Sequence, residues 1–525
     1  MSKRSLMSVQ PLDHEILFPH GDDAPPDWQQ LREFLKAEGR LSKEDALTVI
    51  RTAGILFRKE PNVIKVEYPV NIVGDVHGQY YDLLTIFDTT GSPTTTQYLF
   101  LGDYVDRGCF SVEIVLLMYA IKINFPDTFH MLRGNHECRL LTEHFNFRTE
   151  CELKYDADIY EEFMKSFDAL PLCAVVNERF FALHGGISPE LVTLSQINQL
   201  DRFREPPLKG LLCDLLWADP YSEEGERGIH QSDGEGLVHS FETSASVSDI
   251  HESPSPKGLK GLLGSRKTGL QKVTHFVHNT LRGCSYNYGH DAAQQFLEQN
   301  KLLCIIRAHE AQLEGYKMQF RNPKTGFPCV ITVFSAPNYC DVHRNKGAVL
   351  KLSKNSLHIQ QFLWSRHPYY LPNFMDLFTW SVPFVSEKVL EMLHVLLGAD
   401  AEFSAGSVEL PPAVHEFIWG PDIPAPDAPD ADETQIILNR LALRGPTIRS
   451  KVKTMGRVLQ LYHELKRHNA LVLKMRDCSP GSKVPLKMLV DNGTESASQE
   501  ETFLSAQKVD MVNERHPALQ GTPPA

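Results

Sequence analysis

The sequence predicts an α/β fold, in which strands buried in a sheet or a sandwich are flanked by helices, followed by a C-terminal extension. Two observations predict it. From Val70 to about Leu352, short apolar runs alternate with amphipathic stretches of helical spacing. Beyond Leu352 this alternation stops, and separate helical patterns are joined by stretches rich in Pro and Asp. The pattern leaves open whether the strands form one sheet or two.

The predicted elements begin with two helical patterns at about 28–37 and 42–59, and Ser42 with Asp45 is placed as a capping box at the start of the second. A polar stretch at 222–272 reads as a flexible insertion in a surface loop. The apolar runs that we interpret as strands are Val70–Val73, Tyr98–Leu101, Phe129–Leu132, Phe180–Leu183, Leu303–Ile306 and Val330–Phe334.

Composition excludes several classes of protein. The 525 residues carry a net charge of −13, which argues against a general affinity for nucleic acid or anionic membranes. The ten cysteines include no C-x-x-C pair, which favours free thiols in a reducing compartment. The longest apolar run, Ile114–Ile121, is too short to span a bilayer. We therefore expect a soluble cytoplasmic protein without an integral membrane segment, with the nucleus as a second compartment.

Side chains with the chemistry of metal ligands follow five of the apolar runs, and four of these groups have adjacent glycines. The ligand groups are Asp75 and His77, Asp103 and Asp106, Asn135 with His136 and Glu137, His184, and His309. Taken singly, such a histidine or aspartate is more often a satisfied core or turn residue. Because strand ends converge on one rim of a sheet, five such groups in succession predict a common site.

The chemistry of this set favours two metal ions. It contains carboxylates, imidazoles and an amide, which exceeds what one tetrahedral zinc site requires. Oxygen and nitrogen ligands without thiolate suit iron, zinc or manganese, and a shared carboxylate would hold two ions about 3.5–4 Å apart. Two ions at that spacing can clamp a phosphoryl oxygen, and Arg107 and Arg282 can hold the remaining oxygens bidentately.

Six motifs carry a resemblance to a known family. G-D-V-H-G, G-D-Y-V-D-R-G, L-R-G-N-H-E, H-G-G, R-A-H-E and S-A-P-N-Y occur in the order typical of the metal-dependent Ser/Thr phosphoprotein phosphatases. The resemblance implies a metallophosphoesterase-type β-sandwich flanked by helices. It also implies iron with zinc, or manganese, and a metal-bound hydroxide that attacks phosphorus directly without a phosphoenzyme.

The resemblance also implies a role for each residue of the set. Asp75 and His77 resemble ligands of the first metal, Asp103 resembles the bridge, and Asn135, His184 and His309 resemble ligands of the second. His136, oriented by Asp106, resembles the general acid that protonates the leaving alkoxide. Arg107, Asn135, Arg282 and Tyr339 resemble the phosphate-binding groups.

Residues 366–398 resemble the corresponding segment of calcineurin catalytic subunits, which implies a helix bound by a calcineurin B-like EF-hand regulatory subunit. The alternative is a helix packed on its own domain. The apolar side of the predicted helix carries Val385, Val389, Met392, Leu393 and Leu396. Trp380 and Phe384 are retained for substrate docking, whereas His358 and Gln360 depart from the usual Asn and Arg of a docking strand at 357–362.

Two further segments imply control by calcium. Residues 446–468 form a basic amphipathic pattern typical of calmodulin targets, although a solvated helix is the alternative. Its apolar face carries Ile448, Val452, Met455, Leu459 and Tyr462. Residues 501–525 resemble an autoinhibitory segment through Glu514 and Arg515, and we expect Glu514 over the metals when calmodulin is absent. The resemblance also implies immunophilin–immunosuppressant complexes as partners.

The sequence thus predicts the catalytic subunit of a calcium/calmodulin-regulated serine/threonine protein phosphatase. Two alternatives are a metallophosphoesterase acting on nucleotides or other phosphoesters, and an inactive scaffold. The predicted organisation is an irregular segment at 1–26, a catalytic domain at 27–365, the regulatory-subunit-binding segment at 366–398, linkers at 399–445 and 469–500, and the two segments at 446–468 and 501–525.

Overall fold

The computed structural model describes residues 10–21, 24–221, 276–370, 374, 385 and 499–519. The predicted insertion, the calmodulin-binding segment and the docking residues Trp380 and Phe384 lie outside the described residues. So do Val389, Met392, Leu393 and Leu396 of the predicted regulatory-subunit helix, while Val385 is described and exposed. The chain separates into two units, Met1–His367 with Ser498–Ala525, and Pro368–Ala497. The first unit carries the sheets and the candidate site.

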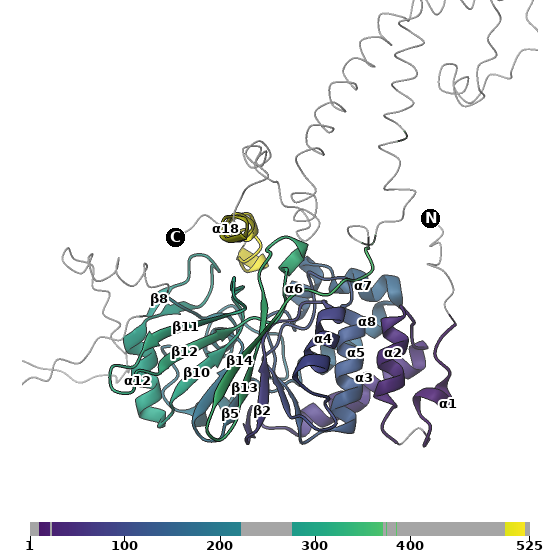
Figure 1. Cartoon of the computed structure of the whole chain (residues 1–525), viewed down its shortest axis with the longest axis horizontal. Helices are drawn as coiled ribbons and strands as arrows, with labels where there is room; N and C mark the ends of the chain where they lie inside the picture. The colour runs from purple at the N-terminus through teal and green to yellow at the C-terminus, as the bar shows by residue number, and fades with distance from the viewer. Residues whose placement is uncertain are drawn as a thin grey trace, which may run out of the picture. The chain divides into compact units, whose positions relative to one another are not determined.

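Two mixed sheets form the centre of the first unit (Figure 1). The six-stranded sheet has the order β1-β5-β6-β10-β12-β11, and the five-stranded sheet has the order β14-β13-β2-β3-β4. The strands of the first are β1 Val63–Val66, β5 Cys173–Val176, β6 Phe180–Leu183, β10 Cys304–Arg307, β12 Pro328–Val333 and β11 Tyr316–Arg321. Those of the second are β14 Leu357–Phe362, β13 Gly347–Leu352, β2 Val70–Val73, β3 Tyr98–Phe100 and β4 Phe129–Met131.

The two sheets pack face to face as a sandwich. Their inner faces share one apolar cluster, in which Ile72, Leu99 and Leu350 from one sheet meet Ile306 and Ile331 from the other. Strands covered on both faces have no solvent side, which is why every residue of β2, β3, β6 and β10 is buried and these strands are mostly apolar rather than alternating. The prediction of an α/β fold is confirmed. The sequence left open whether the strands form one sheet or two, and the structure has two in the sandwich.

Helices cover the outer faces of the sandwich. On the five-stranded side, α5 contacts β4 and is surrounded by α2, α3, α4 and α7, so nearly all of its residues are buried. On the six-stranded side, α12 packs on β10 and β12 (Figure 1). These helices are α2 Trp28–Lys36, α3 Lys43–Lys59, α4 Tyr80–Thr90, α5 Ser111–Asn124, α6 Arg139–His144, α7 Phe147–Lys154, α8 Ala157–Phe167, α10 Leu211–Trp217 and α12 His290–Asn300.

The predicted helices at about 28–37 and 42–59 are present as α2 and α3. At the start of α3, the Ser42 hydroxyl oxygen accepts a hydrogen bond from the Asp45 backbone N–H at 3.1 Å, as expected of a cap. The Asp45 carboxylate accepts from the Ser42 hydroxyl at 2.7 Å and contacts the exposed ring of His14 at 2.6 Å. The two capping side chains therefore bond to each other.

The C-terminal helix α18, Gln499–Asp510, returns to the sandwich at the end of the described chain and appears in yellow above the sheets in Figure 1. Its inner side buries Phe503, Ala506 and Asp510. Beside the sandwich, a small sheet of order β7-β9-β8 contains Asp219–Pro220, Tyr286–Tyr288 and Phe276–His278.

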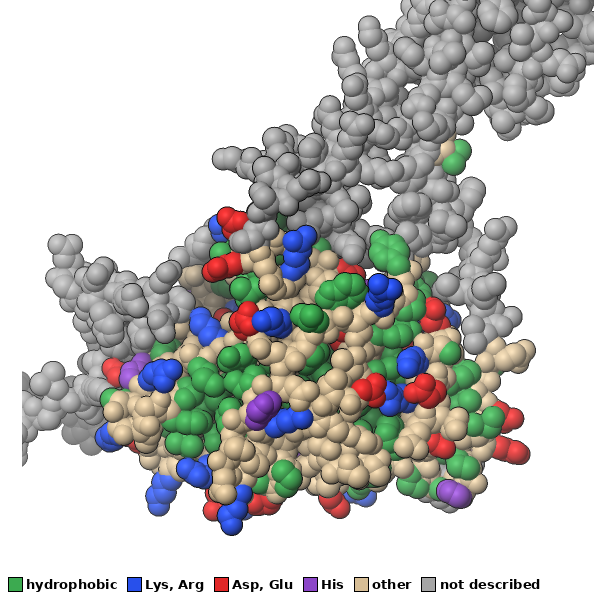
Figure 2. All heavy atoms as spheres, viewed as in Figure 1, with side chains coloured by type: hydrophobic (Ala, Val, Ile, Leu, Met, Phe, Trp, Pro, Cys, Tyr) green, Lys and Arg blue, Asp and Glu red, His purple; other side chains and the backbone are tan. Residues whose placement is uncertain are grey.

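The surface of the described part is mixed in charge. In the orientation of Figure 2, basic side chains are interspersed with acidic ones over the visible face. This distribution agrees with the argument from net charge against a general nucleic-acid surface. Among the helices that the structure describes, none is both long and apolar enough to span a membrane.

Candidate active site and metal centre

The predicted ligands meet at the carboxyl ends of strands from both sheets. β2, β3 and β4 are parallel to one another, and β6 and β10 form a parallel pair in the other sheet, so the loops after each group emerge on one rim. Several residues of these loops have positive φ, including Asp103 at 56°, Asp106 at 68° and His309 at 70°. Such left-handed backbone is costly for non-glycine residues and clusters at functional sites.

Close approach of two loops brings the ends of β3 and β4 together. A Cβ atom on Gly134 would lie 2.2 Å from Oδ1 of Asp103 and 2.4 Å from its backbone nitrogen, so only glycine fits there. The backbone N–H of His136 then donates to Oδ1 of Asp103 at 3.0 Å. This contact fixes the carboxylate and leaves Oδ2 to face the site.

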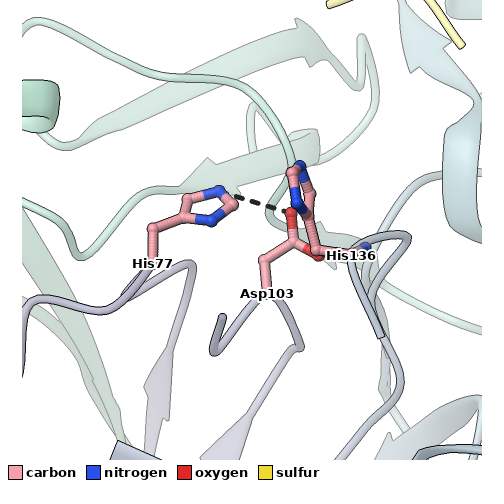
Figure 3. Close-up of side chains that lie close together, drawn as sticks. All are labelled: His77, Asp103 and His136. Carbon is pink, nitrogen blue, oxygen red and sulfur yellow. Dashed lines mark hydrogen bonds and ion pairs between the residues drawn. The ribbon is translucent and has the colours of Figure 1, made fainter. Parts of the chain in front are cut away.

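The first group of ligands comes from the five-stranded sheet. Nε2 of His77 lies 3.4 Å from Oδ2 of Asp103 (Figure 3). It also lies 3.7 Å from Oδ2 of Asp75. Nδ1 of His77 donates to the backbone oxygen of Val105 at 2.9 Å, which orients Nε2 toward the carboxylates. Figure 3 also shows His136 facing the same carboxylate.

The second group joins the two sheets. Nε2 of His184, from the end of β6, lies 2.8 Å from Oδ1 of Asn135, 3.1 Å from Nδ1 of His309 and 3.4 Å from Oδ2 of Asp103. Nδ1 of His184 donates to the backbone oxygen of Leu101 at 3.1 Å. The structure therefore brings together all six residues that were predicted as metal ligands.

The donor set fits two metal ions. One oxygen, Oδ2 of Asp103, lies 3.4 Å from an imidazole nitrogen on each side, as expected of a bridging ligand. The donor atoms of His77, Asp103 and His136, and those of Asp103, His184 and His309, lie within 4.8 Å of one another in each group. Burial raises the pKa of Asp75 to about 7 and also raises the pKa of Asp103, so bound cations would offset the cost of ionising them.

His136 and Asp106 form a buried pair beside the ligands. Nδ1 of His136 donates to Oδ2 of Asp106 at 2.7 Å, and Oδ1 of Asp106 accepts from the Phe147 backbone N–H at 2.9 Å. Burial raises the pKa of Asp106 to about 8 and lowers that of His136. With Nδ1 bonded to Asp106, the other ring nitrogen of His136 is left for a reacting group.

Two buried arginines flank the ligands. Arg282 donates from Nε to Oδ2 of Asp219 at 2.9 Å and from Nη2 to the His309 backbone oxygen at 3.2 Å. The guanidinium carbon of Arg107 lies 4.4 Å from the ring centre of Phe145 and 5.8 Å from that of Tyr339. The predicted phosphate-binding side chains thus surround the ligand cluster.

The C-terminal segment occupies these arginines. Nη1 of Arg107 donates to Oδ1 of Asp510 at 2.8 Å, and its Nη2 lies 3.7 Å from Oε1 of Glu514. Nη1 of Arg282 donates to Oε2 of Glu514. Glu514 therefore contacts both arginines. The neighbouring Arg515 lies over Gly283. A Cβ atom on Gly283 would lie 3.1 Å from Nε of Arg515.

The sequence did not predict the structural roles of three residues at the site. Glu137, read from the sequence as a potential ligand, accepts at 2.8 Å from the backbone N–H groups of Asp103, Tyr104 and Gly134, so it holds the two loops together. Asp219 orients Arg282, and Asp510 contacts Arg107. Only Glu137 had a signal, its position directly after the Asn-His pair.

The predicted docking strand is β14, which lies at an edge of the five-stranded sheet and pairs only with β13 in that sheet order. His358 is exposed on this strand, and Nε2 of Gln360 donates to the Thr89 backbone oxygen at 3.1 Å. Gln360 is therefore tied to α4 rather than standing free at the edge.

Comparisons with known proteins agree with this architecture. Residues 68–313 match a family described as calcineurin-like phosphoesterase. The chain is 42% identical to serine/threonine-protein phosphatase 2B catalytic subunit A2 of Saccharomyces cerevisiae, covering 98% of this chain and 82% of that protein. It is 40% identical to subunit A1 of the same yeast, covering 94% of this chain and 83% of that protein.

A solved structure supports the fold. A protein serine/threonine phosphatase from Saccharomyces cerevisiae, with similarity to human phosphatase PP5, is 30% identical with a TM-score of 0.52. The match covers 66% of this chain and 99% of that one. The family resemblance read from the motifs is confirmed. The chain belongs to the calcineurin-like phosphoesterases and, within them, to the family of serine/threonine-protein phosphatase 2B catalytic subunits.

Proposed function

We propose that this chain hydrolyses phosphoserine and phosphothreonine in proteins, as the names of its relatives state for them. The observation that carries the proposal is the position of Asp103, whose Oδ2 lies 3.4 Å from Nε2 of both His77 and His184. A carboxylate oxygen between two imidazoles, with two arginines beside it, is suited to a phosphoryl group bound over two metal ions.

Asp75, His77 and Asp103 would hold one ion, and Asp103, Asn135, His184 and His309 would hold the other. When bound, two such ions would polarise the phosphoryl group as Lewis acids and lower the pKa of a coordinated water molecule toward neutrality. Iron and zinc, or manganese, are the metals that suit this oxygen and nitrogen donor set. The protein orients these donors through backbone contacts, such as the bond from His77 to Val105.

The remaining side chains bind and protonate the substrate. Arg107, Arg282, Asn135 and Tyr339 would hold the phosphate oxygens and favour the developing charge of the transition state. Asp106 orients the ring of His136 through the 2.7 Å contact at Nδ1. The other nitrogen of His136 then delivers a proton to the leaving oxygen of the serine or threonine. A water molecule attacks the phosphorus directly as the bond to the serine or threonine oxygen breaks, so no phosphoenzyme forms.

The C-terminal segment would regulate the site by binding the same two arginines that would bind the phosphate. Asp510 and Glu514 place carboxylates on the groups that would bind phosphate, so the segment and the substrate compete for them. Calmodulin binding at residues 446–468 would withdraw the segment, and an EF-hand regulatory subunit would bind residues 366–398. The boundaries predicted from the sequence serve as the proposed domains. The cysteines that the structure describes are free, which supports a cytoplasmic location.

An assay with two substrates tests the proposed function. The purified chain is given a phosphoserine peptide and a phosphodiester, each with and without a metal chelator, and then with calcium, calmodulin and the regulatory subunit. We expect hydrolysis of the peptide only, abolished by the chelator and increased by calcium and calmodulin. Hydrolysis of the diester alone would instead identify another phosphoesterase, and no hydrolysis would identify a scaffold.

A deletion tests the proposed regulation. Removing the residues after Glu501 takes Asp510 and Glu514 away from Arg107 and Arg282. Basal phosphatase activity without calmodulin should then rise toward the activated level. Unchanged basal activity would rule out inhibition by this segment.

A further inference from the structure

The segment after α18 leaves the helix through a turn at residues 511–514 and passes the site with a definite register before a 3-10 helix at Pro517–Leu519. Glu514 places its carboxylate on Arg282 and beside Arg107, where the phosphate of a substrate would lie. The next residue passes over Gly283, whose φ of 75° and missing side chain permit the close approach. Position 514 therefore corresponds to the phosphorylated residue, and the residues after it mark where a substrate chain would continue.

Two residues further on, the segment meets an aromatic surface. The ring of His516 lies 4.9 Å from that of Trp217, the last residue of α10, with an angle of 48° between the planes. His516 is 4% exposed and Trp217 is 3% exposed, so the contact is almost fully buried. The backbone N–H of His516 donates to the Arg282 backbone oxygen at 2.9 Å, a bond that any peptide other than proline could make at this position.

The surroundings of His516 favour an uncharged ring. Nδ1 of this residue is buried and has no hydrogen-bond partner in the described part of the chain. Burial lowers the pKa of His516 to about 4, with Glu205 acting in the opposite direction. Trp217 is itself in edge contact with His309 at 5.6 Å, so the aromatic surface adjoins the ligand cluster.

We propose that Trp217 and the Arg282 backbone oxygen form a specificity subsite for the side chain two residues after the phosphoserine or phosphothreonine. The subsite takes an uncharged ring and disfavours a lysine, because burial penalises charge and Arg282 supplies a positive charge nearby. This inference rests on the proposed phosphatase function and adds a sequence preference to it.

The test uses the full chain with Asp510→Ala, Glu514→Ala and His516→Ala, which removes the side-chain contacts that hold the segment against Arg107, Arg282 and Trp217. Phosphoserine peptides that differ only at the second residue after the phosphoserine carry Phe, His, Ala or Lys there. We expect kcat/KM for Phe to exceed that for Ala by about threefold to tenfold, the range for an aromatic pair. Lysine should give the lowest value.

Trp217→Leu in the same background should bring the Phe-to-Ala ratio of kcat/KM to within about twofold, whereas Trp217→Phe should keep part of the preference. Rates with p-nitrophenyl phosphate, which has no following residue, normalise each variant for damage to the ligand cluster. Equal hydrolysis of all four peptides would overturn the subsite and leave the phosphatase function intact. Hydrolysis of none would overturn both.

A second measurement does not depend on the peptides. In the otherwise unaltered chain, His516→Ala should raise basal activity toward p-nitrophenyl phosphate by about threefold, while His516→Phe should keep the basal level. Val512→Ala, at a residue 61% exposed in the same segment, is the matched control. Equal basal activity of the His516→Ala and His516→Phe variants would contradict a role for the ring.

Discussion

The ligand cluster and the arginines beside it are held in place in different ways. Two of the three ligand histidines have a second contact with main chain, His77 with Val105 at 2.9 Å and His184 with Leu101 at 3.1 Å. Asp75 and Asp103 likewise accept backbone hydrogen bonds, both at 3.0 Å. By contrast, Arg107 meets carboxylates from Asp510 and Glu514, at the far end of the sequence.

This difference separates a permanent part of the site from an exchangeable one. Contacts with main chain in the sandwich persist whenever the protein is folded, so the ligand geometry is preorganised. Ion pairs with the C-terminal segment can be replaced by any group of the same charge and shape. Arg107 is nearly fully buried and needs a negative partner, which either the segment or a phosphate can supply, whereas Arg282 also keeps its ion pair with Asp219.

The largest effect should come from the permanent part. Asp103→Ala removes the oxygen that lies between His77 and His184, so we expect metal content and activity to fall together, the latter by about three orders of magnitude or more. Metal analysis and peptide hydrolysis measure both. Asp88→Ala removes an exposed carboxylate as the control. A variant that kept full metal and activity would show that the site is wrongly assigned.

A smaller effect is expected next to the ligands. Asp106→Asn keeps the shape of the side chain but replaces the carboxyl group that accepts from Nδ1 of His136 and orients its ring. We expect kcat to fall by about a hundredfold with metal content unchanged, because general acid catalysis is lost rather than the ions. Loss of metal from this variant would mean that Asp106 belongs to the ligand cluster instead.

Substitutions in the exchangeable part should act in the opposite direction. Glu514→Gln and Asp510→Asn weaken the ion pairs with Arg282 and Arg107, so basal activity without calmodulin should rise by about threefold to tenfold. Glu500→Gln, an exposed position on α18, is the matched control. If the basal activity of these variants equalled that of the parent, the ion pairs of the segment would not restrain activity, and the segment could not be called exchangeable.

The smallest effect concerns stability rather than turnover. Burial raises the pKa of Asp82 from 3.8 to about 6, although Gln79 and Ser365 donate hydrogen bonds to it. The folded protein therefore binds this proton more tightly, and the resulting stability is present below pH 4 and lost as the pH rises to 6.

Replacing this carboxyl group by an amide should remove that dependence. The difference in the free energy of unfolding between Asp82→Asn and the parent should change by about 2 kcal/mol between pH 4 and 6.5, in favour of the variant at the higher pH. Urea unfolding at several pH values measures it. A constant difference would show that Asp82 titrates normally, and activity per folded molecule should not change.

The sequence predicts the permanent part better than the exchangeable part. Asp75, Asp103 and His184 lie within two residues of the ends of buried runs, and because strand ends converge on one rim, the sequence could predict a common site. The pairing of β2 with β13, from Val70–Val73 and Gly347–Leu352, joins residues nearly three hundred positions apart and has no local signal.

The structural roles of Glu137 and Asp510 could not be predicted from the sequence either. Glu137 looks like a ligand, because its type and position fit one, but its carboxylate accepts from main-chain N–H groups. Asp510 lies in a helix whose composition says nothing about its target, and only the fold brings it to Arg107. The motif resemblance supplied Glu514, which physical reasoning about the segment alone would not have selected.

The two sheets contribute unequally to the ligand set, and this has a mechanical meaning. Asp75, His77, Asp103 and Asn135 come from loops of the five-stranded sheet, whereas His184 and His309 come from the six-stranded sheet. An ion bound by both Asp103 and His184 would therefore link the two sheets of the sandwich. Metal binding and the association of the two sheets are then thermodynamically coupled. The free energy of unfolding should therefore increase as metal ions fill the site.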